Sequence, residues 1–183
     1  MINVGFIGLG GMGMHQAKTF AGVAGCQVIA GADPSPEMQA RFAQTFPNAH
    51  IYATPDELLA QPTIDAVVIA VPTGFHQFVA SAALAARLPV LLEKPMARTV
   101  TQCTQLIEEA EQANTLLMVA HCRRFDSYWT AWGDYVTTGK LGTPVLWRDV
   151  RAHSGLGGWF LDHELGGGPL LDGAIHNRTG HDR

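Results

Sequence analysis

Apolar and polar residues follow two different spacings along the first 120 residues of the chain. Short and nearly continuous apolar runs, typical of strands buried on both faces of a sheet, occur at residues 2–7, 27–32, 66–71, 90–92 and 116–120. Between them, apolar residues recur every three to four positions, as on the buried face of a helix, most clearly over residues 101–113. This alternation predicts an α/β fold built on a doubly wound parallel sheet.

The pattern changes near residue 122. Residues 125–136 have helical spacing, although their aromatic side chains include Trp129, Trp132 and Tyr135. Residues 144–152 predict a new strand. We therefore expect one domain over residues 1–121 and the start of a second, α+β domain over residues 122–183.

A glycine-rich turn follows the first predicted strand and opens the first predicted helix. It consists of Gly8, Leu9, Gly10, Gly11, Met12 and Gly13. Gly8 permits the tight turn, Gly10 lets a pyrophosphate approach the backbone, and Gly13 lets helix and strand pack closely. A plain glycine-rich turn is the alternative, but the strand–turn–helix context favours a Rossmann-type dinucleotide site with phosphates at the helix N-terminus.

An acidic residue stands at the end of the second predicted strand. Asp33 follows Gly13 by 20 residues, where a carboxylate would hold the ribose hydroxyls of a dinucleotide. The same charge repels a 2′-phosphate, and the nearest downstream arginine is Arg41. The sequence therefore favours NAD over NADP.

Two further polar groups follow predicted strands. Pro72, Thr73 and His76 come after the strand at 66–71, and Glu93 and Lys94 come after the strand at 90–92. Open α/β sheets bind ligands at the carboxyl ends of their strands, so these residues are candidates for the same site. Considered alone, Lys94 would more often be a surface lysine, and His76 would more often be a residue that starts a helix.

The C-terminal part of the chain holds a candidate proton relay. If residues 170–176 are helical, Asp172 and His176 lie four residues apart on one face. A carboxylate and an imidazole so placed transfer protons at neutral pH. A pair that only stabilises the helix is the alternative.

Composition narrows the class of protein. With 12 Lys and Arg against 16 Asp and Glu, the net charge of −4 argues against nucleic-acid binding through phosphates. Three cysteines without C-x-x-C spacing predict neither a disulfide framework nor a zinc ribbon, and the histidine spacing predicts no metal site. No apolar run reaches about 18 residues and no signal peptide precedes the first strand, so we expect a cytoplasmic protein that does not span a membrane.

Taken in order, these motifs resemble the Gfo/Idh/MocA oxidoreductase family, over residues 1–177. The matching pieces are the glycine fingerprint, Asp33, Pro72-Thr73 with His76, Glu93-Lys94-Pro95, His-Cys-Arg-Arg-Phe at 121–125, and Gly166-Gly167-Gly168 with Asp172 and His176. Inositol and sugar dehydrogenases are the most similar members.

The resemblance implies an NAD(P)-dependent dehydrogenase that transfers a hydride between a secondary alcohol of a cyclic polyol or sugar and the nicotinamide. It implies that His176 is the base, that Asp172 orients it or relays the proton, and that Lys94 hydrogen-bonds the substrate oxygen and touches the nicotinamide ribose. It implies a substrate pocket formed with His121, Arg124 and Trp159. Full-length relatives are expected to be homo-oligomers.

The tail departs from the family pattern. Relatives usually carry an Asp three residues after the motif histidine, where this chain has Thr179, and they are nearly twice as long. We therefore expect a C-terminally truncated chain that binds NAD and turns over poorly. A non-catalytic dinucleotide-binding module, an inactive fragment, a reductase and an NADP enzyme stay open as alternatives.

Overall fold

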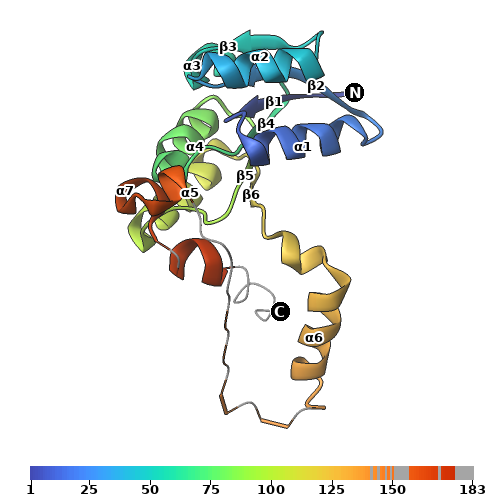
Figure 1. Cartoon of the computed structure of the whole chain (residues 1–183), viewed down its shortest axis with the longest axis vertical. Coiled ribbons are helices and arrows are strands. Elements are labelled where there is room, and N and C mark those ends of the chain that lie inside the picture. The colour runs from blue at the N-terminus through green and yellow to red at the C-terminus, as the bar shows by residue number, and fades with distance from the viewer. Residues whose placement is uncertain are drawn as a thin grey trace. The chain divides into compact units, whose positions relative to one another are not determined.

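The computed structural model describes residues 1–140, 142, 143, 145, 146, 148, 150, 157–168 and 170–175 (Figure 1). The chain divides into two compact units, Met1–Ala120 and His121–Arg183, and each is described by itself.

A six-stranded parallel sheet forms the centre of the first unit, in the order β3-β2-β1-β4-β5-β6. The strands are β1 (Ile2–Ile7), β2 (Cys26–Ala32), β3 (His50–Tyr52), β4 (Ala66–Ile69), β5 (Val90–Leu92) and β6 (Leu117–Val119). The chain starts in the middle of the sheet and winds outward in both directions, so the strand order reverses between β1 and β4. This confirms the predicted doubly wound, Rossmann-type sheet. Sheets of this type bind ligands outside the carboxyl ends of the strands where the order reverses, which here are β1 and β4.

Helices connect the strands and cover the sheet. They are α1 (Gly11–Ala21), α2 (Pro36–Thr45), α3 (Pro55–Leu59), α4 (His76–Ala85) and α5 (Val100–Ala113), with a 3₁₀ turn η1 (Thr73–Phe75) before α4. Because neighbouring strand residues point to opposite faces, β4 sends Val67 and Ile69 into one apolar cluster and Val68 into another. The second cluster contains Met14 of α1 and Phe42 of α2. The strand is therefore apolar throughout because both faces are buried.

Besides one-residue shifts at the ends of β2, β6 and α5, the structure differs from the sequence prediction at three elements. Strand β3 carries no clear apolar signal, since it is three residues long, begins with the exposed His50 and forms the edge of the sheet. Strand β4 ends at Ile69 rather than at residue 71, because Pro72 lies directly before the 3₁₀ turn η1. The predicted helix 125–136 is α6 (Ser127–Thr137), which begins after the N-cap Asp126.

The second unit contains short helical segments. Besides α6 they are η2 (Cys122–Phe125), η3 (Gly158–Leu161), α7 (His163–Gly166) and a π-helical turn η4 (Leu170–Ala174). Of the predicted strand 144–152, only residues 145, 146, 148 and 150 are described. These four residues are not in a strand, and Val145 is 94% exposed. The described part of this segment therefore does not form the predicted strand.

None of the helices in the described part of the chain combines the length and the apolar character that a membrane span requires.

Candidate cofactor site

The glycine turn between β1 and α1 has three different steric environments. Gly8 has a φ of +88°, and a Cβ there would lie 2.6 Å from the carbonyl oxygen of Ala70. A Cβ on Gly13 would overlap the carbonyl oxygen of Gly8, so helix and strand are in contact at this point. A Cβ on Gly10 would meet no atom within 4 Å. Gly8 and Gly13 therefore hold the turn together, and Gly10 faces open space.

The N-terminus of α1 has the character of an anion site. Gly10 is the N-cap, no side chain caps the helix, and no acidic residue lies in its first turn. The first N–H groups of the helix and its positive dipole end thus stay available beside the open space over Gly10. This cradle, which a side chain would fill, fits the pyrophosphate of a dinucleotide.

Asp33 is held rigidly beside the glycine turn. Its Oδ2 accepts a 2.8 Å hydrogen bond from the N–H of Leu9, and its Oδ1 accepts one of 2.9 Å from the N–H of Ser35. An ionised carboxylate has about four acceptor positions, so two stay available for a pair of ribose hydroxyls. Arg41 is exposed on α2. Asp33 therefore supplies a fixed negative charge beside the glycine turn, as the prediction of a ribose-binding carboxylate requires.

His76 begins α4 and is buried, with 1% of its surface exposed. Its Nδ1 lies 2.7 Å from the carbonyl oxygen of Pro95, and its Nε2 lies 2.9 Å from that of Val71. Burial is the largest influence on this ring, and with the positive charge of Lys94 it lowers the pKa of His76, although the two carbonyls act in the opposite direction. The prediction that His76 contacts the cofactor stays untested, and both of its nitrogens face the backbone.

Glu93 connects the end of β5 to α1. Its buried carboxylate accepts a 2.6 Å hydrogen bond from Nε2 of Gln16 and one of 3.0 Å from the N–H of Lys94. The Lys94–Pro95 peptide bond is cis, and Lys94 itself is half-buried. The position of the Lys94 backbone is therefore coupled to the first helix.

These contacts bring together the candidate residues of the first unit. The ends of β1 and β2 are joined through Asp33, those of β4 and β5 through His76, and β5 is joined to α1 through Glu93. Thr73 is buried and Pro72 is half-buried in the segment between β4 and α4. Every predicted cofactor residue thus lies at the same end of the parallel sheet, where the carboxyl ends of its strands meet.

The substrate candidates lie in the second unit. His121 is half-buried, and burial together with the charge of Arg124 lowers the pKa of its imidazole. Trp159 stacks on Phe160 with ring centroids 3.8 Å apart. Asp172 lies in the π-helical turn η4, while His176 lies outside the described residues, so the predicted relay between them stays a prediction.

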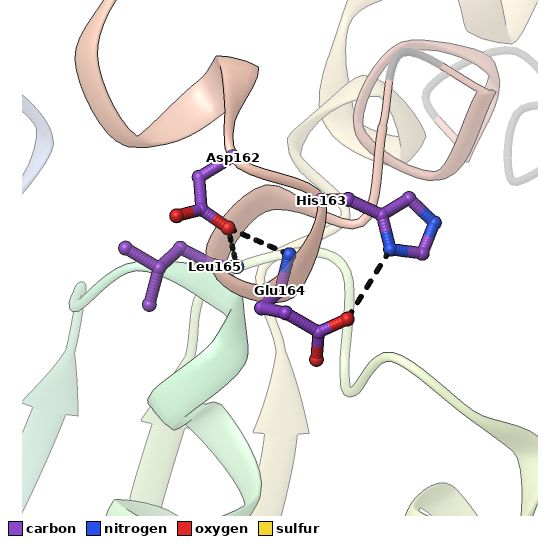
Figure 2. A network of polar contacts seen from close by, with 4 residues as sticks. All are labelled: Asp162, His163, Glu164 and Leu165. Atoms are coloured by element: carbon purple, nitrogen blue, oxygen red, sulfur yellow. Dashed lines mark hydrogen bonds and ion pairs between the residues drawn. The ribbon is translucent and has the colours of Figure 1, made fainter.

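A local polar network surrounds the N-terminus of α7 (Figure 2). Oδ1 of Asp162 accepts hydrogen bonds from the N–H groups of Glu164 and Leu165, and Nδ1 of His163 lies 3.5 Å from Oε1 of Glu164. Both members of the His163–Glu164 pair are largely exposed, so their attraction contributes little. Over the residues that the structure describes, no three metal-ligating side chains cluster together. The network is the N-cap of a short helix.

Two residues of the site escaped the sequence analysis. Ser35 fixes Asp33 through an Asx turn, which the sequence Asp33-Pro34-Ser35-Pro36 could have indicated. Gln16 had no such signal, because its partner Glu93 is 77 residues away.

Comparison with known proteins agrees with this geometry. Residues 2–121 match the model of an oxidoreductase family with an NAD-binding Rossmann fold. The chain is 33% identical over 156 residues to inositol 2-dehydrogenase 1 from Saccharopolyspora erythraea, covering 84% of this chain and 46% of the relative. It is 30% identical over 185 residues to a 1-carboxy-3-chloro-3,4-dihydroxycyclohexa-1,5-diene dehydrogenase from Comamonas testosteroni, covering 96% and 45%.

A solved structure is similar as well. It is the scyllo-inositol dehydrogenase from Lactobacillus casei with bound NAD(H) and scyllo-inositol, with a TM-score of 0.71 and 26% identity over 78% of this chain and 42% of that one. The chain spans about half the length of the curated relatives that it matches.

Proposed function

The chain belongs to the Gfo/Idh/MocA oxidoreductase family, whose NAD-binding Rossmann fold covers residues 2–121, and we propose that it carries the cofactor half of an NAD-dependent polyol or sugar dehydrogenase. The reaction converts a secondary alcohol of a cyclic polyol or sugar to a ketone, with transfer of a hydride (one proton and two electrons) to the nicotinamide and release of the hydroxyl proton. Residues 122–183 would be the start of the substrate domain. The names of the relatives, which include inositol 2-dehydrogenases, support this substrate class.

Residues of the first unit would bind the dinucleotide. The open space over Gly10 and the N–H groups of α1 would accept the pyrophosphate, and the fixed carboxylate of Asp33 would accept hydrogen bonds from the adenosine ribose. When bound, NAD supplies the nicotinamide carbon that accepts a hydride from the carbinol carbon. The residues proposed to bind NAD and Lys94 would thus lie together at the carboxyl ends of the strands.

The remaining residues would bind and deprotonate the alcohol. The ammonium of Lys94 would donate a hydrogen bond to the substrate oxygen and so favour its alkoxide character. His176 would take the hydroxyl proton, with Asp172 orienting it. His121, Arg124 and Trp159 would surround the ring of the substrate. Because the pKa of His121 is lowered, its neutral form would be available to accept or donate a hydrogen bond to a hydroxyl near neutral pH.

One observation carries the proposal: the uncapped N-terminus of α1 and the Asp33 carboxylate lie beside the same glycine turn. In that turn, a Cβ on Gly10 would meet no other atom within 4 Å. Isothermal titration calorimetry of the 183-residue chain with NAD and NADP tests the cofactor site. We expect saturable binding that is tighter for NAD. Absence of NAD binding by the folded chain would contradict the proposal.

Formation of NADH from myo-inositol, scyllo-inositol or glucose, followed by absorbance, tests the reaction. Turnover that is abolished by Lys94→Ala would support the assignment of Lys94. Because the chain spans about half the length of these relatives, we expect slow turnover. A chain that binds NAD and forms no detectable NADH would favour the alternative, a non-catalytic dinucleotide-binding module.

A further inference from the structure

One buried imidazole joins the two loops that carry Thr73 and Lys94. The Nε2 of His76 contacts the carbonyl oxygen of Val71 at 2.9 Å, directly after β4, and its Nδ1 contacts the carbonyl oxygen of Pro95 at 2.7 Å, directly after Lys94. The ring therefore spans the loops that follow two neighbouring strands of the sheet.

This bridge is a specific arrangement and not a general feature of packing. Buried carbonyl oxygens require a hydrogen-bond donor, and losing one leaves an unpaired polar group. A neutral imidazole has a single N–H, so the tautomer decides which of the two carbonyl oxygens receives a hydrogen bond, and the second nitrogen only contacts the other carbonyl. The side chain of His76 is also fully enclosed, so the ring has little freedom to turn away.

We propose that His76 is a positioning residue, which sets the spacing between the Val71–Thr73 and Lys94–Pro95 segments and so directs Lys94 toward the nicotinamide ribose. The N–H of Lys94 is held from one side by Glu93, and the carbonyl of the next residue is held from the other side by His76. The backbone on both sides of the Lys94 side chain is thus fixed. This inference rests on the proposed function, since it needs a bound dinucleotide for Lys94 to meet.

The test compares two ligands with the 183-residue chain. NAD contains the nicotinamide ribose, whereas ADP has the same adenosine and two phosphates without it. His76→Phe keeps a planar ring and removes both nitrogens, and His76→Gln keeps one amide donor. We expect His76→Phe to weaken NAD binding about five- to tenfold, the effect of about one neutral hydrogen bond, with ADP binding changed less than about twofold. His76→Gln should lie between His76→Phe and the parent.

A double-mutant cycle with Lys94→Ala tests whether His76 acts through Lys94. If it does, His76→Phe should change NAD affinity by less than about twofold once Lys94 is alanine, because coupled residues are not additive. Gln77→Ala is the matched control, since it removes a hydrogen bond to Ser81 on the same helix without reaching either loop. Circular dichroism of each variant confirms that it is folded, and His76→Gln serves if His76→Phe does not fold.

Each result has one meaning. Equal losses of NAD and ADP affinity in the His76 variants would show a role in stability alone and overturn the proposal, as would additive losses in the double variant. Failure of the parent chain to bind either ligand would instead overturn the proposed function.

Discussion

The main-chain N–H of Leu9 donates a 2.8 Å hydrogen bond to Oδ2 of Asp33. This bond joins the glycine turn after β1 to the end of β2, so the residue proposed to bind the ribose and the turn proposed to bind the phosphates form one unit. A change to the carboxylate should therefore affect both parts of the proposed dinucleotide site.

Replacement of Asp33 by alanine should weaken NAD binding about 10- to 100-fold, because charge-assisted hydrogen bonds contribute about 1.5–3 kcal/mol. It should also reduce the preference for NAD over NADP, since the charge that repels a 2′-phosphate is lost. Calorimetric titration with both cofactors measures the two effects. Asp65→Ala is the control, because Asp65 also accepts a main-chain N–H, that of Asn3, but precedes β4. Unchanged NAD affinity in Asp33→Ala would show that the ribose assignment is wrong.

Alanine at Gly10 and alanine at Gly13 should have opposite consequences. Gly10 has a φ of −62° and open space around its missing Cβ, so Gly10→Ala should leave the thermal unfolding midpoint unchanged while weakening NAD binding about tenfold through overpacking against the phosphates. Gly13→Ala places a methyl group against the Gly8 carbonyl and should destabilise the fold by about 1–3 kcal/mol. Equal effects of the two changes on both measurements would contradict the assigned roles.

Removal of the Glu93 carboxylate should reduce the free energy of unfolding by about 1–3 kcal/mol, because Gln16 and the N–H of Lys94 lose a buried acceptor. Gln16→Ala removes only one of these contacts and should cost less. Urea denaturation followed by far-ultraviolet circular dichroism measures both. A smaller loss in Glu93→Ala than in Gln16→Ala would argue against the carboxylate as the link between α1 and Lys94.

The lowered pKa of His76 predicts that stability falls in mild acid. In the unfolded chain the imidazole titrates near its ordinary pKa of 6.5, whereas the buried ring resists protonation. The unfolded state therefore binds more protons below about pH 6.5, and the free energy of unfolding decreases as the pH is lowered from that value through the lowered pKa of the folded state.

Urea denaturation at about pH 7.5 and about pH 5.5 measures this loss. His76→Phe should show a smaller difference between the two conditions than the parent, although His121 contributes in the same direction. The exposed His15 provides the control variant His15→Gln, which should keep the pH dependence of the parent. An identical pH dependence in His76→Phe and the parent would contradict the prediction.

Local patterns were enough to predict five of the six strands of the sheet and the glycine turn. Five strands were predicted because a strand buried on both faces must be apolar at successive positions, as Val67 and Val68 of β4 are. The glycine positions were predictable because left-handed backbone at Gly8 and close contact at Gly13 exclude a side chain whatever surrounds them.

What only the tertiary structure decided depends on partners that are distant in the sequence. The edge strand β3 could not be recognised, since pairing with β2 and not its own apolarity makes it a strand. The sequence predicted that His76, Glu93 and Lys94 lie at the carboxyl ends of the strands. It could not show that the imidazole of His76 lies between the carbonyls of Val71 and Pro95, or that Gln16 hydrogen-bonds Glu93. Hydrogen bonds form between atoms about 3 Å apart, and residues 19 or 77 positions apart reach that distance only after the sheet has formed.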